Sequence, residues 1–480
     1  MRKGPFLNKI DRNFTTRDSL GIEGVATSMS ADLCPVVNTV TPRAFYWPFM
    51  VWIYYDFYKY SGIEERTVSA FDQYLKRQDY YFVLATLLNE NSDRKNLVGI
   101  TQSQIDLDES EGPYPFNPRY FKTRYGGMQY YNAGCQTLQF ITDEDAVGNT
   151  FSFPKLTKLG EEMALSFEEI IKDTDYYKHY RRNDKAVPKK TLKEYGKIIN
   201  IGLNGFDKSK KILRHRLFEI NPQLSLCADY IKYLHDQYGI VDLDYSTCRK
   251  AFFDHITPSG APIEIPDSLK NISAGWEIVV GRQYFTSGLE MIWKPMLEAI
   301  RSPKTITEWI SAILSDPGFE LDLDIKLQEL VADCIYDFDT REEMISDARR
   351  GVSWQTSVEE GIYIILSVYN WLNERTAFGE EETLLYYGND SQSISLYELK
   401  NTVNKYMEHP IKDFIVFVMQ EWLIRQHYYT AFEKMLQKRD GFYYEIVDGK
   451  YHHRGHDFYI DFQGIRMIQL MQVMKDLDML

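Results

Sequence analysis

Apolar residues recur at intervals of three and four along most of this chain, and this spacing limits its fold more than any other feature of the sequence. Side chains spaced in this way share one face of an α-helix, so each such stretch predicts a helix packed along that face. In the second half of the chain these stretches are 224–238, 281–300, 307–314, 327–336, 357–373, 396–407 and 410–437. The sequence therefore predicts a mainly α fold.

The chain has 480 residues, more than the ~250 to 300 that one hydrophobic core usually serves, so we expect several domains. Changes in composition predict five segments. These are an N-terminal helical region (1–95), a winged-helix-like α+β unit (96–175), a basic segment (176–216), a helical domain (217–440) and a C-terminal hairpin and helix (441–480). The hairpin is predicted around the Asp448-Gly449 turn, because alternating residues flank this dipeptide.

Threonine and proline residues are expected to mark the starts of two helices, one after Thr41 and Pro42 and one after Thr157. Thr41 and Pro42 precede an aromatic stretch, in which Pro48 either kinks the helix or delays its start. Further along, two short strands are expected over 137–142 and 149–154, on either side of a polar turn. Thr157 then precedes a helix, and the side chains predicted to be buried in this unit are Phe153, Leu159, Met163 and Phe167.

The order strand, turn, strand and LTxxGxxxA is typical of the end of a winged-helix domain, and Leu156 begins that motif here. Together with residues 17–49, 71–88, 117–140 and 155–171, it resembles the N-terminal region of an uncharacterised bacterial protein family encoded among anti-phage defence and restriction genes. The resemblance covers about the first 180 residues. It consists of scattered small and aromatic positions without a catalytic motif, so it implies a genomic setting rather than a chemistry.

Positive charge is concentrated between Lys178 and Arg216, where thirteen basic residues face three acidic ones. This gives the segment a formal charge of +10 and leaves −24 for the rest of the chain, whose net charge is −14. Lysine and arginine bind phosphate by releasing counterions, so the segment predicts a nucleic-acid interface. The residues that we predict for it are Arg181, Arg182, Lys185, Lys189, Lys190, Lys193, Lys208, Lys210, Lys211, Arg214 and Arg216.

Aromatic residues are interleaved with these charges and could stack on bases, namely Tyr177, Tyr180, Tyr195 and Phe206. The alternative is a solvated helix face, or a strip that pairs with acidic surface on this protein or on a partner. Acidic residues gather in turn between Asp316 and Asp347. That acidic strip could bind a basic partner, mimic nucleic acid, dock on the basic segment or simply be solvated surface.

No catalytic motif of a common nucleotide-binding, protease or hydrolase family is present, so we predict no catalytic residue. The pairs Asp242/Asp244 and Asp322/Asp324 could hold Mg²⁺, but such pairs are frequent by chance. His452, His453, His456 and Asp457 are suitable zinc ligands by type, yet adjacent residues on a strand point to opposite faces. We therefore predict no metal and no cofactor.

Five well-separated cysteines without a C-x-x-C pair argue against a disulfide framework or a cysteine zinc site. The apolar stretches are too short to span a membrane, and the N-terminus lacks the apolar core of a signal peptide, so a cytoplasmic location is expected.

The preferred hypothesis is a non-enzymatic DNA-associated or scaffold subunit of a bacterial anti-phage or anti-plasmid defence complex, with other subunits and duplex DNA as partners. The alternative is a divergent metal-dependent nuclease or another phosphate-acting enzyme.

Overall fold

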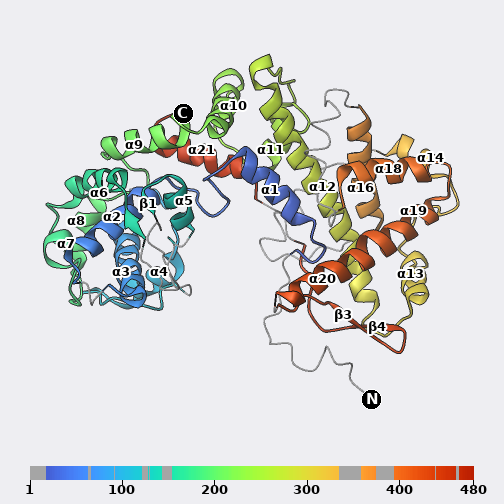
Figure 1. The fold of residues 1–480 in the computed structure, drawn as a ribbon, viewed down its shortest axis with the longest axis horizontal. Helices are drawn as coiled ribbons and strands as arrows, with labels where there is room; N and C mark the ends of the chain where they lie inside the picture. Colours follow the sequence, from blue (N-terminus) through green and yellow to red (C-terminus); the bar gives the residue numbers. More distant parts are fainter. Residues whose placement is uncertain are drawn as a thin grey trace. The chain divides into compact units, whose positions relative to one another are not determined.

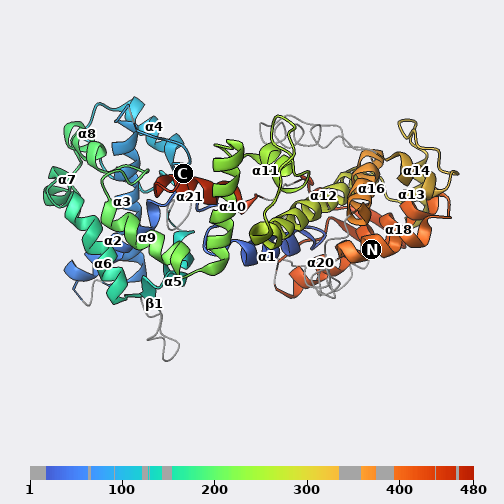
Figure 2. The same ribbon diagram turned by 90° about the horizontal axis from the view of Figure 1, so that it is seen from above.

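The computed structural model of the chain describes residues 18–62, 66–90, 92–121, 128, 130–142, 154–334, 358–374, 394–437, 439–460 and 464–480. The chain folds into two compact units, and each is built from two stretches of sequence. The first unit contains Met1–Ser30 and Asp244–Gly464, and the second contains Ala31–Leu243 and Ile465–Leu480. Both units consist mainly of helices (Figures 1 and 2), which confirms the predicted mainly α fold.

In the second unit, helices are accompanied by one small hairpin. Its elements are α2 (Tyr46–Tyr60), α3 (Val68–Leu87), α4 (Ile100–Glu109), α5 (Tyr131–Thr137), β1 (Ile141–Thr142), β2 (Lys155–Leu156), α6 (Lys158–Ile171), α7 (Asp175–His179), α8 (Lys189–Ile198), α9 (Asp207–Arg214), the π-helical turn η3 (His215–Glu219), α10 (Pro222–Tyr238) and α21 (Arg466–Asp476). Helix α1 (Glu23–Leu33) crosses from the first unit into the second.

Aromatic side chains of α2 form the core of the second unit. Helix α2 begins at Tyr46, after the start predicted at Thr41 and Pro42, so Pro48 falls in its first turn, where a missing N–H leaves no helical hydrogen bond unmade. The Phe167 ring of α6 lies 5.7 Å from the rings of Phe49 and Trp52, measured between centroids. All three side chains are completely buried. The core therefore joins α2 to α6.

The helix predicted after the hairpin is present, but the hairpin is shorter than predicted. Residues 137–140 end α5 and form a turn, so only Ile141 and Thr142 of the first predicted strand are extended, and they pair with Lys155 and Leu156. Strands β1 and β2 pair antiparallel, and the Thr157 hydroxyl caps α6 by accepting a hydrogen bond from the Gly160 N–H at 3.0 Å. Met163 and Phe167 are buried as predicted, and Leu159 is half-buried. Most of the predicted second strand, including Phe153, lies outside the described residues.

Helix α12 is the long central element of the first unit. The other elements of this unit are α11 (Tyr245–Phe252), η4 (Asp267–Leu269), α12 (Lys270–Ala299), α13 (Ile306–Leu314), α14 (Leu327–Asp333), α16 (Val358–Glu374), α18 (Leu396–Tyr406), α19 (Ile411–Phe417), the π-helical stretch η5 (Val418–Arg425), α20 (Gln426–Leu436), β3 (Tyr444–Val447) and β4 (Lys450–His453). Helices α12 and α16 pack closely because two glycines meet there. A Cβ on Gly361 would lie 2.6 Å from the carbonyl oxygen of Gly288.

The C-terminal hairpin forms around the predicted turn. Asp448 and Gly449 join β3 to β4 with φ angles of 51° and 75°, the left-handed pair of a two-residue hairpin turn. The hairpin belongs to the first unit, whereas α21 belongs to the second. There, Asp476 accepts two hydrogen bonds of 2.9 Å from the Arg43 guanidinium. The two predicted C-terminal elements therefore do not form one small cap.

Within the described parts of the chain, no helix is both long enough and apolar enough to cross a bilayer. The acidic strip is only partly described, because its residues from 335 onward lie outside the described ranges. Its first part, from Asp316 to Asp324, is loop between α13 and α14.

Candidate functional site

The basic segment folds into α7, α8, α9 and η3 of the second unit, and the structure divides its cations into two groups. One group is used by the fold itself, and the other projects from the surface. The division depends on which faces of α8 and α9 are buried, because the apolar positions of these short helices pack inward and leave only part of the charge outside.

Arg181 and Arg182 belong to the internal group. Their guanidinium groups lie 3.2 and 3.0 Å from the carboxylate of Asp56, which is completely buried on α2. A buried carboxylate needs close cations and hydrogen bonds to offset its lost hydration. Burial lowers the pKa of Arg181, but electrostatic interactions with Asp56 and Tyr177 raise it by more than burial lowers it. The net shift of the pKa is therefore upward. Both arginines therefore stabilise the fold around Asp56.

The charges of α9 and η3 are also partly used internally. Lys210 is 3% exposed, and its amino group lies 2.7 Å from the Asp478 carboxylate. Arg214 lies 3.7 Å from the same carboxylate, and Arg216 donates to the Leu138 carbonyl at 2.9 Å. Lys210 is too buried to reach a phosphate, so it has no place in a nucleic-acid interface.

Lys190, Lys193 and Lys197 form the clearest external group. Spacings of three and four residues place them along one face of α8, and all three are exposed. We call these three residues the α8 strip. Lys190 also lies 3.9 Å from Glu194 on the same helix, a distance typical of a weak surface pair.

Close packing on the opposite face holds α8 in place. Leu192 and Tyr195 are buried there, and the Gly196 carbonyl accepts a 2.8 Å hydrogen bond from the Asn89 side chain. A Cβ on Gly196 would lie only 2.2 Å from the Ala85 carbonyl oxygen of α3. The missing side chain lets α8 lie directly against α3, which fixes the direction in which the α8 strip points.

Lys197 was not among the residues predicted for the interface, and the remaining predicted cations do not extend this strip into one continuous face. Lys208 and Lys211 are exposed on α9, but α8 and α9 lie apart in both views (Figures 1 and 2). Lys185 is exposed in the loop before α8, and Lys189 pairs with Glu111. The structure thus brings together only part of the predicted interface.

Two of the four aromatic residues proposed to stack on bases lie in the core, which corrects the prediction for Tyr195 and Phe206, whereas Tyr177 and Tyr180 are half-buried. Tyr195 and Phe206 are each 1% exposed. Tyr195 stacks on Tyr176 at 4.5 Å, and Phe206 lies 4.9 Å from Phe167, measured between ring centroids. Tyr177 is covered by the Arg181 guanidinium at 3.7 Å. Packing in the hydrophobic core therefore accounts for the positions of Tyr195 and Phe206.

Carboxylates and histidines do not converge on a metal site within the described ranges, where no group of three or more His, Cys, Asp or Glu side chains could hold an ion. Asp242 pairs with Lys475 at 2.6 Å, and Asp244 caps α11. Asp322 accepts a hydrogen bond from the Asp324 backbone. These carboxylates have structural partners, which is the simpler explanation of the two pairs.

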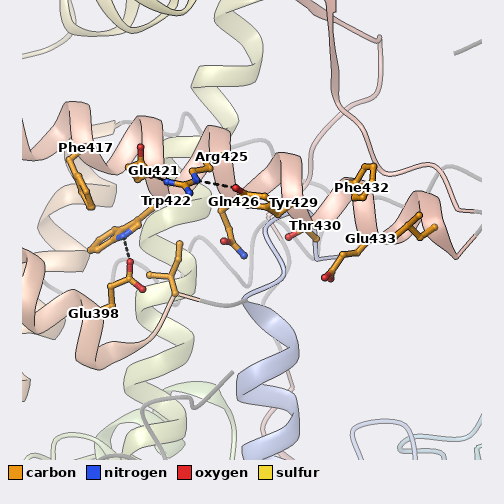
Figure 3. A pocket seen from close by; sticks show the side chains of 12 residues that line it. Glu398, Phe417, Glu421, Trp422, Arg425, Gln426, Tyr429, Thr430, Phe432 and Glu433 are labelled. Atoms are coloured by element: carbon orange, nitrogen blue, oxygen red, sulfur yellow. Dashed lines mark hydrogen bonds and ion pairs between the residues drawn. The ribbon is translucent and has the colours of Figure 1, made fainter. Parts of the chain in front are cut away.

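A second surface feature, a groove in the first unit, was not predicted from the sequence. Its volume is about 540 Å³, and Figure 3 shows the side chains that line it in a row along η5 and α20, with Glu398 facing them from α18. Part of its lining is apolar and exposed, including Tyr429, Phe432 and Leu436. The signal in the sequence is an apolar face on 410–437 that continues past the residues needed for the core.

Comparisons of this chain with protein-family models, with curated proteins and with solved structures find no match, so the assignment of a function depends on the geometry described above.

Proposed function

We propose that this chain is a non-enzymatic, DNA-associated subunit of a cytoplasmic bacterial anti-phage or anti-plasmid defence complex, and that the α8 strip binds the phosphate backbone of duplex DNA. The observation that carries the DNA contact is the single exposed face formed by Lys190, Lys193 and Lys197. The defence setting is supported by the resemblance of the first 180 residues alone.

The dimensions of the α8 strip suit a phosphate backbone. Lys190 and Lys197 are seven positions apart, which is roughly 10 Å along a helix. Duplex DNA carries about one charge per 1.7 Å of its axis, so several phosphates lie within reach of the three ammonium groups. Contacts of this kind fix position without reading sequence. The chain would therefore bind duplexes of different sequence with similar affinity.

Helix α6 is a poorer candidate for the DNA contact, although it follows the winged-helix-like hairpin. Met163 and Phe167 fix its inner face in the core, so its outer face carries Glu161, Glu162 and Glu169. Carboxylates repel phosphates, and the exposed face of α6 would weaken binding. The α8 strip is therefore the part of this region that fits DNA.

The test compares two triple variants of the full chain in binding a labelled duplex of about 20 base pairs at about 50 mM salt. The α8 variant carries Lys190→Gln, Lys193→Gln and Lys197→Gln. The control variant carries Lys158→Gln, Lys172→Gln and Lys232→Gln, which are also exposed lysines of the second unit. Both lose the same net charge.

We expect the α8 variant to bind at least about tenfold more weakly, because glutamine does not neutralise a phosphate and so releases no counterion when the duplex binds. The control variant should stay within about threefold of the parent chain. Equal weakening of both variants would mean that only net charge matters, and unchanged binding of both would exclude the α8 strip.

A further inference from the structure

The groove of the first unit combines an apolar floor with an acidic rim. Trp422 is buried at its base, where the indole N–H donates to the Glu398 carboxylate at 3.1 Å. Phe417, Tyr429 and Phe432 add aromatic surface along the groove. Because Tyr429, Phe432 and Leu436 are exposed and line the same groove, they offer apolar surface that a partner can bury.

The shape of the groove favours a long occupant. Its lining runs along one continuous helical stretch from Phe417 to Leu436. Nineteen residue steps at 1.5 Å each correspond to roughly 28 Å, or about five helical turns. A compact small molecule would fill only part of that length. A helix lying in the groove would cover it along the whole of η5 and α20.

The charges of the groove favour a basic occupant. Its lining contains three glutamates and one arginine, and Arg425 is already paired with Glu421 at 2.6 Å. The surplus is therefore the negative charge of Glu398 and Glu433. Behind the groove, the buried Arg282 interacts electrostatically with both Asp18 and Glu398, and one cation beside two carboxylates leaves the net charge there negative.

We infer that this groove binds the apolar face of a basic amphipathic helix from a partner protein. Apolar side chains of the partner would pack on Phe432, Leu436 and the Trp422 floor, while lysines or arginines beside them would face Glu398 and Glu433. This inference is independent of the DNA contact, because the groove belongs to the first unit and the α8 strip to the second.

The experiment uses the full chain and a fluorescent synthetic helix of about 18 residues, made of leucine along one face and lysine elsewhere. A second peptide replaces every lysine with glutamate. The groove variant carries Phe432→Ala with Glu433→Lys, both at exposed positions. The matched control is Glu298→Lys, because Glu298 is also an exposed glutamate in the last turn of a helix of the first unit. Thermal unfolding of each variant checks that its fold is intact.

We expect the lysine peptide to bind the parent chain and the control within about twofold of each other, and the groove variant at least about tenfold more weakly. The glutamate peptide should not bind. The inference is overturned if the groove variant and the control bind the lysine peptide equally, or if the glutamate peptide binds as well. It is also overturned if sedimentation shows a dimer of this chain that the groove variant abolishes, because a second copy would then be the occupant.

Discussion

The buried carboxylate of Asp56 pairs with two arginines of the basic segment and so reduces the positive charge that this segment presents at the surface. The basic segment is strongly positive in the sequence, but Arg181 and Arg182 turn inward toward Asp56, and Tyr74 donates a third hydrogen bond to the same carboxylate. The arginines that remain at the surface are fewer than the sequence suggests. A prediction of binding residues from charge alone cannot see this, because the partner lies 125 residues away along the chain.

Replacing Asp56 with asparagine should destabilise the second unit. The change leaves two partly buried guanidinium groups without their carboxylate, which typically costs about 3 kcal/mol or more. Denaturant unfolding measures the loss. Asp173→Asn is the control, because Asp173 is exposed and forms only a surface pair with Lys178, so its loss should cost less than about 1 kcal/mol. Similar stability of both variants would contradict a structural role for the Asp56 cluster.

His427 gives the first unit a stability that depends on pH. Its ring is completely buried, with Nδ1 donating to the Ser19 carbonyl at 2.9 Å and Nε2 accepting from the Tyr443 N–H at 3.2 Å. Both nitrogens are used in the neutral form, and burial lowers the pKa of His427 from 6.5 to about 4. Between these two values the unfolded chain binds a proton that the folded chain does not bind.

Stability should therefore fall as the pH drops through this window, by about 2 kcal/mol between pH 7.5 and pH 5. The measurement is the free energy of unfolding at both pH values for the parent chain and for His427→Gln. The variant should be less stable at pH 7.5, because glutamine cannot make both hydrogen bonds, but it should lose less stability on acidification. An equal loss in both proteins would assign the pH dependence to other groups.

At the scale of the element, α8 is positioned by its contact with α3. Gly196→Ala would place a methyl group against the Ala85 backbone and should destabilise the second unit by roughly 2 kcal/mol, because backbone atoms cannot move aside cheaply. Gly202→Ala is the control, because the nearest atom to its Cβ would be 3.7 Å away and its φ is not left-handed. Thermal unfolding distinguishes the two. A Gly196→Ala protein as stable as the control would show that α8 is held less tightly than described.

Local signals in the sequence were enough to predict several elements. Thr157 marks the start of α6 through a side-chain hydrogen bond to the nearby Gly160 N–H, and this cap is present. Asp448-Gly449 specified its turn in the same local way. The burial of Tyr195 and Phe206 could not be predicted, because it depends on α6 and α7 side chains that only the folded chain brings near.

At the scale of the whole molecule, the two units interrupt one another along the chain. Residues 1–30 join the first unit, and the last sixteen residues, 465–480, join the second. Composition cannot reveal such an arrangement, because the residue content of α1 and α21 does not indicate the unit in which each helix packs. The groove escaped prediction for a related reason: an exposed apolar face and a buried one have the same periodicity in the sequence.

The salt dependence of duplex binding tests the central claim most directly. In a plot of log affinity against log salt concentration, each phosphate contact contributes about 0.9 to the slope, so removing the three lysines of the α8 strip should flatten it by roughly 2.7. The control variant with Lys158, Lys172 and Lys232 replaced should keep the parent slope. If the slope of the α8 variant equals that of the parent chain, Lys190, Lys193 and Lys197 do not contact DNA phosphates, and the proposed function is wrong.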